Sequence, residues 1–171
     1  MFDKWLLAVD LDGTLWDHED VSKMKPPFRR INQYAIVDSR GDMLKAYEYM
    51  VKLVKWAKEN NAVVVTLSWN QEEKAVEALK TLGLYDLFDY HLINPKPIKH
   101  ILLNNLLEKL RESGIIIPVK KIVYIDDHTW HLDDIRNLVG EVFFIHAHRD
   151  CNSFETCRDL ITKYLNRVKK T

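Results

Sequence analysis

Short apolar runs that stop abruptly at polar residues recur along this chain, and the first of them is the most informative. It spans Leu6–Val9, is too short for an ordinary helix, and ends at two aspartates, Asp10 and Asp12. A run of this length indicates a strand that is buried on both faces inside a parallel sheet. Open sheets of this kind bind ligands beyond the carboxyl ends of their strands. Asp10 and Asp12 therefore mark a candidate site.

Apolar runs of this kind alternate with segments in which apolar residues recur at helical spacing. The runs predict strands at residues 2–9, 62–67, 90–93, 121–125 and 142–145, and the helical segments lie at 44–57, 70–83, 99–112, 132–138 and 154–168. Strands that alternate with helices favour an α/β fold with a parallel sheet and right-handed crossovers. We expect a single domain over residues 1–171, because the sequence contains no repeat, low-complexity tract or visible linker.

Residues 21–42 interrupt this alternation directly after the first strand. Pro26-Pro27 excludes a helix there, and the Asp-Ser-Arg-Gly segment at residues 38–41 is typical of a turn. We expect a short hairpin on the ligand side of the sheet. Insertions in that place are commonly lids or specificity elements.

Composition narrows the class of protein. The 25 acidic and 25 basic residues balance, so no overall field draws the chain toward nucleic acid or a membrane surface. No apolar run approaches the roughly 20 residues of a membrane span. The only two cysteines, Cys151 and Cys157, lack the spacing of a metal site, and we expect reduced thiols and a cytoplasmic protein.

Polar residues follow four of the predicted strands. They are Asp10 and Asp12, then Ser68 with its neighbours Trp69 and Asn70, then Lys96 or Lys99, and finally Asp126 with Asp127. Carboxylates, a hydroxyl and a lysine at the same edge of a sheet point to a functional site rather than to turn chemistry. Oxygen-only ligands favour a hard cation, and Mg²⁺ uses few carboxylates.

The first of these segments resembles a known motif. The sequence Asp-Leu-Asp-Gly-Thr-Leu at residues 10–15 is similar to the first motif of the haloacid dehalogenase-like phosphohydrolases. Ser68 resembles the second motif, a lysine between residues 94 and 99 the third, and the Asp126-Asp127 pair the fourth.

More narrowly, the chain resembles the magnesium-dependent phosphatase family, a subgroup with a small insertion. The resemblance covers about residues 4–148 and rests on Trp16 and on the segments 26–28, 38–41, 85–88 and 124–127. The chain has Gly13 where that subgroup often has Tyr. Lys96-Pro97 is similar to the wider superfamily, whereas Pro97-Ile98-Lys99 is more similar to the subgroup and favours Lys99 as the motif lysine.

The resemblance implies a Rossmann-like, doubly wound sheet of about five strands in the order 5-4-1-2-3. It implies that Asp10 attacks phosphorus and becomes an aspartyl-phosphate, and that Asp12 acts as general acid and then general base. Mg²⁺ would be held by Asp10, by the Asp12 carbonyl and by Asp126, with Asp127 as a further ligand or as a hydrogen-bond partner of one. Ser68, with Trp69 and Asn70 beside it, and the motif lysine would hold phosphate oxygens.

Charge and aromatic residues add to this interpretation. Two carboxylates and a phosphate dianion outweigh Mg²⁺ and one lysine, so the bound complex should favour the protonated form of Asp12. Trp16, Trp69 and Trp130 each follow a motif and together suggest an apolar wall for a ring or aryl group.

We therefore expect a Mg²⁺-dependent phosphomonoesterase that acts on a small phosphorylated metabolite or a phosphotyrosine-like group, with no nucleic-acid or membrane partner. Three alternatives remain. Dehalogenase chemistry would leave Asp12 and the Asp126-Asp127 pair without a role. A nucleic-acid end phosphatase is disfavoured because this chain has no net positive charge. A regulatory phosphate-binding domain is disfavoured by the intact set of motif residues.

Overall fold

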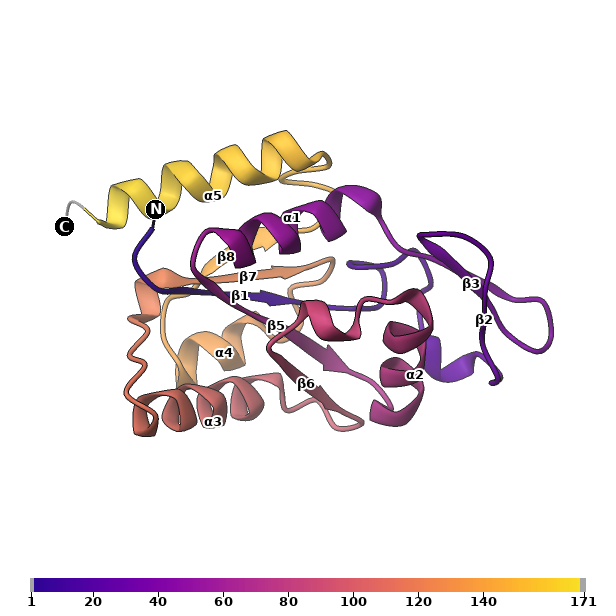
Figure 1. Ribbon diagram of the computed structural model, residues 1–171. Helices are drawn as coiled ribbons and strands as arrows, with labels where there is room; N and C mark the ends of the chain where they lie inside the picture. Colours follow the sequence, from indigo (N-terminus) through magenta and orange to yellow (C-terminus); the bar gives the residue numbers. More distant parts are fainter. Residues whose placement is uncertain (1, 170–171) are drawn as a thin grey trace.

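A five-stranded parallel sheet forms the centre of the protein, which is described over residues 2–169 by a computed structural model (Figure 1). Its strands are β1 (Trp5–Val9), β5 (Ala62–Trp69), β6 (Tyr90–Asn94), β7 (Ile122–Asp126) and β8 (Phe143–His146). They lie in the order β6-β5-β1-β7-β8, and each neighbouring pair is parallel. The α/β fold is confirmed, and the strand order is the one that the family resemblance implies, counted from the opposite edge.

Helices cover both faces of the sheet. On one face lie α1 (Glu48–Glu59), α2 (Glu72–Leu82) and α5 (Phe154–Val168), and on the other lie α3 (Lys99–Glu112) and α4 (Leu132–Leu138). Trp5, Leu7 and Val9 belong to the first core, whereas Leu6 and Ala8 belong to the second. Strand β1 is therefore buried on both faces, as its continuous apolar run predicts. Within the described residues, no helix is long and apolar enough to cross a membrane.

The chain reverses its winding direction beside β1. It first proceeds through β5 to β6 at one edge, and it then returns to β7 and β8 on the other side of β1. Parallel α/β sheets bind ligands at such a switch point, outside the carboxyl ends of the strands. The amide of Asp10 donates to the Ile125 carbonyl at 2.9 Å, so the ends of β1 and β7 meet at this point.

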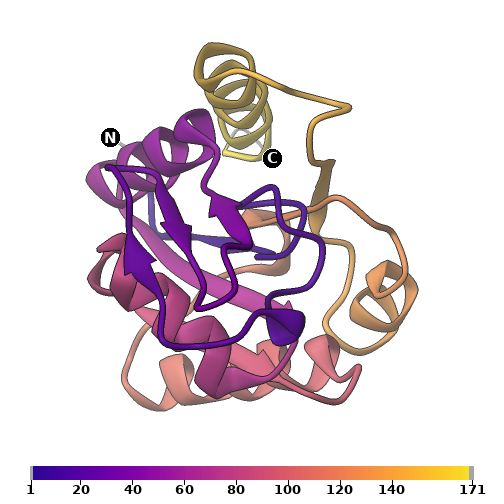
Figure 2. The same ribbon diagram turned by 90° about the vertical axis from the view of Figure 1, so that its right-hand side faces the viewer.

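A second, antiparallel sheet lies at the carboxyl end of β1 and faces the viewer in Figure 2. Its strands are β2 (Arg29–Arg30), β3 (Ala35–Val37) and β4 (Met43–Lys45), and a 3-10 turn, η1 (Val21–Lys23), precedes them. We call residues 21–45 the insert. The prediction of a two-stranded hairpin that ends at residue 42 is too short by one strand.

The prediction that a helix begins at Leu44 is also wrong, because α1 begins at Glu48. Leu44 pairs with Ile36 across β3 and β4, and both side chains are fully buried. Strand pairing and burial therefore override the helical spacing of the apolar residues around Leu44.

The two cysteines form a disulfide between Cys151 and Cys157, so the expectation of reduced thiols is wrong. A capping box at Ser153 begins α5 and turns the chain so that Cys157, in the first turns of the helix, lies against Cys151. Both residues are buried. The argument for a cytoplasmic location that rested on free thiols thereby loses its basis.

Candidate active site

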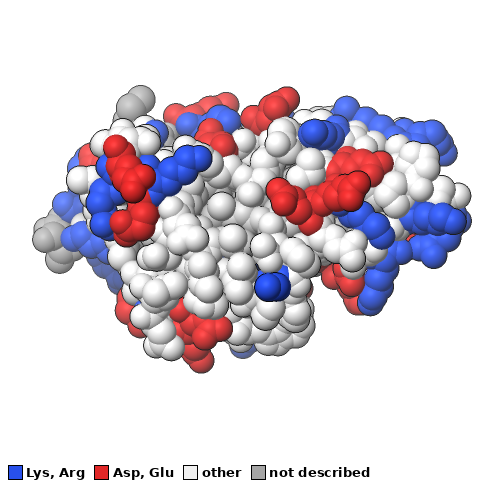
Figure 3. Space-filling model, turned by 90° about the horizontal axis from the view of Figure 1, so that it is seen from below, with Lys and Arg blue, Asp and Glu red and all other residues white. Residues whose placement is uncertain are grey.

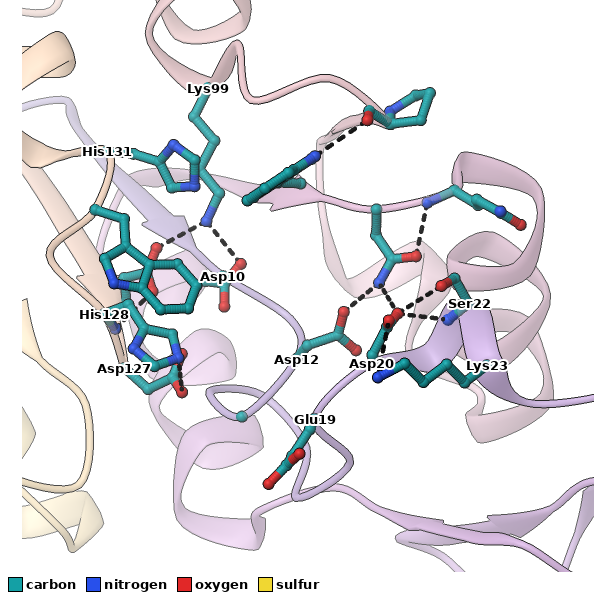
Figure 4. A pocket seen from close by; sticks show the side chains of 17 residues that line it. Asp10, Asp12, Glu19, Asp20, Ser22, Lys23, Lys99, Asp127, His128 and His131 are labelled. Atoms are coloured by element: carbon teal, nitrogen blue, oxygen red, sulfur yellow. Dashed lines mark hydrogen bonds and ion pairs between the residues drawn. The ribbon is translucent and has the colours of Figure 1, made fainter.

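A cleft of about 740 Å³ opens at the carboxyl ends of the strands, between the main sheet and the insert (Figure 4). Most of the residues that the motifs predict line this cleft: Asp10, Asp12, Trp69, Asn70, Lys99, Asp126, Asp127 and Trp130. Three predicted residues, Trp16, Ser68 and Lys96, are absent from its lining.

Lys99 joins the ends of β1 and β7 through two ion pairs. Its Nζ lies 2.8 Å from Asp10 Oδ1 and 2.7 Å from Asp126 Oδ2. All three side chains are nearly inaccessible to solvent. Lys96, by contrast, is exposed on the loop before α3. Of the two candidate lysines, Lys99 is therefore the one that reaches the cleft.

Three carboxylates come close enough to share a cation. One oxygen each from Asp10, Asp126 and Asp127 lies within 4.8 Å of the others. Three ionised carboxylates beside the single ammonium of Lys99 leave an excess of two negative charges, which a divalent cation would neutralise. Burial raises the pKa of Asp10 and of Asp127, because charged carboxylates are costly there without a cation. The residues present thus fit an oxygen-bound ion such as Mg²⁺.

Thr14 links two of these carboxylates. Its hydroxyl lies 3.2 Å from Asp10 Oδ2 and 3.1 Å from Asp127 Oδ1, and it accepts a hydrogen bond from the Asp127 amide at 2.9 Å. Gly13 is as important, because its φ of +69° is in the left-handed region and a Cβ there would overlap the Asp127 carboxylate. The loops after β1 and β7 therefore make direct contact.

Asp12 points into the cleft from a separate set of donors. Its Oδ1 accepts hydrogen bonds from Trp16 Nε1 at 2.8 Å and from the Val21 amide at 3.0 Å, and its Oδ2 accepts one from Asn70 Nδ2. Burial raises the pKa of Asp12 to about 6, although these hydrogen bonds act in the opposite direction. A carboxyl group in this environment can carry a proton close to neutral pH.

The prediction that Trp16 forms part of the substrate wall is contradicted. Trp16 is fully buried in the core, and its indole reaches the cleft only through the hydrogen bond to Asp12. Its ring packs in the same core as Trp5, Leu7 and Val9 of β1. It positions Asp12 rather than contacting a ligand.

The second motif is divided by the end of β5. Ser68 is buried, and its Oγ has no hydrogen-bond partner among the described residues. Asn70 contacts Asp12, as described, and also lies 3.4 Å from Asp20 Oδ1. Trp69 donates from Nε1 to the Pro95 carbonyl at 3.0 Å, which holds the indole at the cleft wall. An unpaired buried hydroxyl is uncommon in folded proteins, and this one lies next to Trp69, which lines the cleft.

Aromatic rings form the outer wall of the cleft. The rings of Trp69 and His131 meet edge to face at 5.6 Å, and those of His128 and Trp130 stack in parallel at 3.8 Å. The two indoles remain 46% and 68% exposed, respectively, so apolar ring surface is available to a ligand. Burial, and then the charge of Lys99, lower the pKa of His131 and favour its neutral form.

Charge is distributed unevenly although it balances overall. Seen from below, lysine and arginine side chains gather at the end of the molecule that the insert forms (Figure 3). The exposed cations of the insert are Lys23, Lys25, Arg29, Arg30, Arg40 and Lys45. Lys23 also lines the cleft. Composition alone gave no indication of this local positive surface.

Sequence reasoning missed four residues that organise the site. Tyr124 donates to Asp126 Oδ2 from within β7, and Thr14 links the two loops. His146, at the end of β8, and His148, just after it, bind the backbone carbonyls of Asp127 and Gly13. Two histidines at the end of a predicted strand were a signal, but nothing in the sequence connected them to the motifs.

A protein-family model matches most of the chain. The model of a family described as Acid Phosphatase matches residues 5–166. The matched region includes every residue of the cleft and most of α5. A search of functionally curated proteins finds no match.

Several solved structures share the fold. A 3-deoxy-D-manno-octulosonate 8-phosphate phosphatase from Moraxella catarrhalis, in complex with magnesium ion, phosphate ion and KDO, is 18% identical with a TM-score of 0.58, covering 96% of this chain and 89% of its own. The cobalt-bound phosphatase YrbI from Haemophilus influenzae is 15% identical with a TM-score of 0.56, covering 94% and 88%. A protein from Streptomyces avermitilis MA-4680, assigned to the HAD family hydrolases, is 18% identical with a TM-score of 0.52, covering 85% and 74%. These likenesses confirm a fold of the haloacid dehalogenase type.

Proposed function

Because the chain belongs to the acid phosphatase family, we propose that it is a magnesium-dependent phosphomonoesterase that works through an aspartyl-phosphate. One observation carries this proposal. Asp10 pairs with Lys99 and belongs to the cluster of three carboxylates, whereas Asp12, two residues away, lies outside that cluster and accepts hydrogen bonds from Trp16, Val21 and Asn70. Two neighbouring carboxylates in different environments suit two different tasks.

Asp10 is the nucleophile in this mechanism. An oxygen of its carboxylate forms a bond to phosphorus while the bond from phosphorus to the leaving oxygen breaks. The ion pair with Lys99 favours the ionised form of Asp10 that attack requires, against the effect of burial. Mg²⁺ held by Asp10, Asp126 and Asp127 would supply positive charge that offsets the repulsion between carboxylate and phosphate.

Asp12 moves the protons. It gives its proton to the leaving oxygen in the first step, and in the second it takes one from the water that attacks the aspartyl-phosphate. Inorganic phosphate leaves, and Asp10 is regenerated. The raised pKa of Asp12 supports the first task, and its hydrogen bonds from Trp16 and Asn70 hold the carboxylate that must form in between.

The walls of the cleft suggest the substrate class. Exposed indole surface on Trp69 and Trp130 suits a planar or apolar leaving group, as in an aryl or phosphotyrosine-like ester, and small phosphorylated metabolites would also fit. The insert acts as a small lid in this proposal. Its exposed cations favour substrates that carry negative charge beyond the scissile phosphate, so a phosphorylated oligonucleotide is included among the test substrates.

The test is a panel of phosphate monoesters, namely aryl, sugar, nucleotide, peptide and oligonucleotide, assayed with purified protein and Mg²⁺. We expect phosphate release that stops in EDTA and returns with Mg²⁺, and no release by the matched variant Asp10→Asn. Borohydride treatment during turnover should convert Asp10 to homoserine, because it reduces an acyl phosphate. Turnover with no modification at Asp10 would contradict the aspartyl-phosphate, and full activity in chelator would contradict the metal.

A further inference from the structure

The last residue of β7 and the loops after β1 and β7 carry the three carboxylates of the candidate metal site, so the distance between these loops affects the geometry of the site. They touch where Gly13 approaches the Asp127 carboxylate and where Thr14 binds Asp127 through both its amide and its side chain.

Two histidines contact the backbone of the same loops. His146 donates from Nε2 to the Asp127 carbonyl at 2.8 Å, and His148 donates from Nε2 to the Gly13 carbonyl at 2.8 Å. Because a carbonyl oxygen can only accept, the Nε2 of each ring carries the hydrogen. The pair thus binds one backbone carbonyl in each of the two loops, from positions only two residues apart.

The ring of His148 is fixed on its other edge. The Tyr49 hydroxyl lies 2.5 Å from Nδ1, within hydrogen-bond distance. The Tyr47 ring packs against the imidazole at 4.3 Å. His148 also has a φ of +62°, a left-handed conformation that is uncommon for a residue with a Cβ. Such a conformation persists where the surrounding contacts impose it, and it is frequent at functional sites.

The segment that bears both histidines is anchored at each end. We call it the β8–α5 turn (residues 146–151); it leads from β8 toward α5 at the upper right of Figure 2. At its start the Ala147 amide donates to the Asp126 carbonyl at 2.9 Å, and the His146 amide donates to Asp150 Oδ2 at 2.7 Å. At its end the buried disulfide joins Cys151 to Cys157 of α5. The turn is therefore a rigid support.

We propose that His146 and His148 are positioning residues of the phosphatase site: through the carbonyls of Asp127 and Gly13 they hold the two metal-binding loops in contact. The inference rests on the proposed function for the identity of the metal. Neither ring lines the cleft, so neither is expected to contact substrate. Removing either donor should release its loop and weaken the divalent-cation site, as loss of outer hydrogen-bond partners does elsewhere, by roughly 10–100-fold.

The test compares His148→Ala with His148→Gln and His146→Ala with His146→Gln. Glutamine retains an N–H donor near the position of Nε2, and both replacements keep a Cβ, so backbone strain at residue 148 is matched within its pair. The matched control is His91, whose Nε2 donates to the Tyr85 carbonyl at 3.1 Å outside the cleft, changed in the same two ways. Tyr49→Phe removes only the hydroxyl that faces His148 and serves if the histidine variants fail to fold.

Mg²⁺ affinity is measured by calorimetric titration of the full chain, and kcat and the Mg²⁺ concentration for half activation are measured with an aryl phosphate. We expect the alanine variants to lose roughly 10–100-fold in Mg²⁺ affinity. The glutamine variants should recover most of that loss, Tyr49→Phe should show a smaller loss, and the His91 variants should show none. Unchanged affinity in folded alanine variants, or an equal loss in the alanine and glutamine variants, would overturn the inference. Wild-type protein that binds Mg²⁺ but hydrolyses nothing would contradict the proposed function alone, since the affinity comparison would still stand.

Discussion

Trp16 Nε1 lies 2.8 Å from Asp12 Oδ1, so a tryptophan that is fully buried in the core directly contacts the proposed general acid. The hydrogen bond favours the ionised form of Asp12 and opposes the effect of burial on its pKa. A side chain of the core therefore influences the pKa of a residue in the cleft.

Trp16→Phe should raise the pKa of Asp12, because the carboxylate loses a donor. A general acid must be protonated in the free enzyme, so kcat/KM should fall as the pH rises through the pKa of about 6. In Trp16→Phe this descending limb should move to higher pH, and stability should fall by about 1–3 kcal/mol. A pH profile of kcat/KM with an alkyl phosphate measures the shift. If the descending limb of the pH profile stays in place in a folded variant, Trp16 does not influence the pKa of the general acid.

The two motif aspartates should differ in their dependence on the leaving group. Asp10→Asn should abolish turnover of every substrate, since no nucleophile remains. Asp12→Asn should slow alkyl phosphates by about 10²–10⁴-fold but aryl phosphates less, because an aryl oxygen leaves with less need of a proton. The measurement is kcat/KM for a series of leaving groups. An equal loss of kcat/KM for every leaving group would contradict the role of Asp12 as general acid.

The metal ligands should differ in their importance. Asp126→Ala should cost more Mg²⁺ affinity than Asp127→Ala, because Asp126 is the more deeply buried and pairs with Lys99. Ca²⁺ should replace Mg²⁺ poorly, since its longer and looser coordination misplaces the nucleophile. Titrations of activity with each ion in both variants provide the check. Ca²⁺ that supports full turnover would argue against this geometry.

Asp38 should make the stability of the protein sensitive to acid. Its carboxylate accepts the amides of Lys25 at 2.7 Å, Arg40 at 2.8 Å and Asp42 at 2.8 Å, and these bonds, that of Lys25 first, lower its pKa to about 2. A lowered pKa stabilises the folded state fully above the unfolded value of about 4. That contribution should disappear as the pH falls from about 4 toward 2.

Thermal unfolding of wild type and Asp38→Asn between about pH 2 and pH 6 tests this linkage. The variant should have the lower Tm at the upper end of the range, and the two curves should converge in acid. The same change at the exposed Asp133 is the control for the loss of one carboxylate. A constant difference between wild type and Asp38→Asn would show that ionisation of Asp38 is not involved.

The insert should govern the choice among charged substrates. Replacing the exposed Lys25 and Arg29 with glutamate should raise KM for a phosphate ester that carries further negative charges, and it should leave a small aryl phosphate nearly unaffected. The double variant Lys55→Glu, Lys120→Glu makes the same charge change at exposed positions outside the insert. The measurement is the ratio of kcat/KM for the two substrates. A ratio that shifts equally in both double variants would point to overall charge rather than to the insert.

The sequence predicted the parts of the fold that depend on local pattern. Strand β1 and helix α5 are predictable because a continuous apolar run and a capped amphipathic segment each fix one structure locally. The positions of Asp10, Asp12 and Asp126 follow from motifs that stand at strand ends. Parallel topology then brings those ends together.

Long-range contacts account for what the sequence did not predict. Strand β4 exists because Leu44 pairs with Ile36, and local spacing around Leu44 favours a helix instead. The Cys151–Cys157 bond depends on the turn before α5, and the inward rotation of Trp16 depends on the core beneath its loop. His148 lies 135 residues from Gly13, so no spacing rule could connect the two.

Gly13 has a consequence for how this protein can vary. Any side chain at residue 13 would occupy the space of the Asp127 carboxylate and would also strain a backbone with a φ of +69°. The first motif and the fourth are therefore not independent, although 114 positions separate them. A relative with tyrosine at the position of Gly13 must hold its counterpart of Asp127 elsewhere, and transplanting that tyrosine alone should fail. A compensating change at residue 127 or in the β8–α5 turn would have to accompany it.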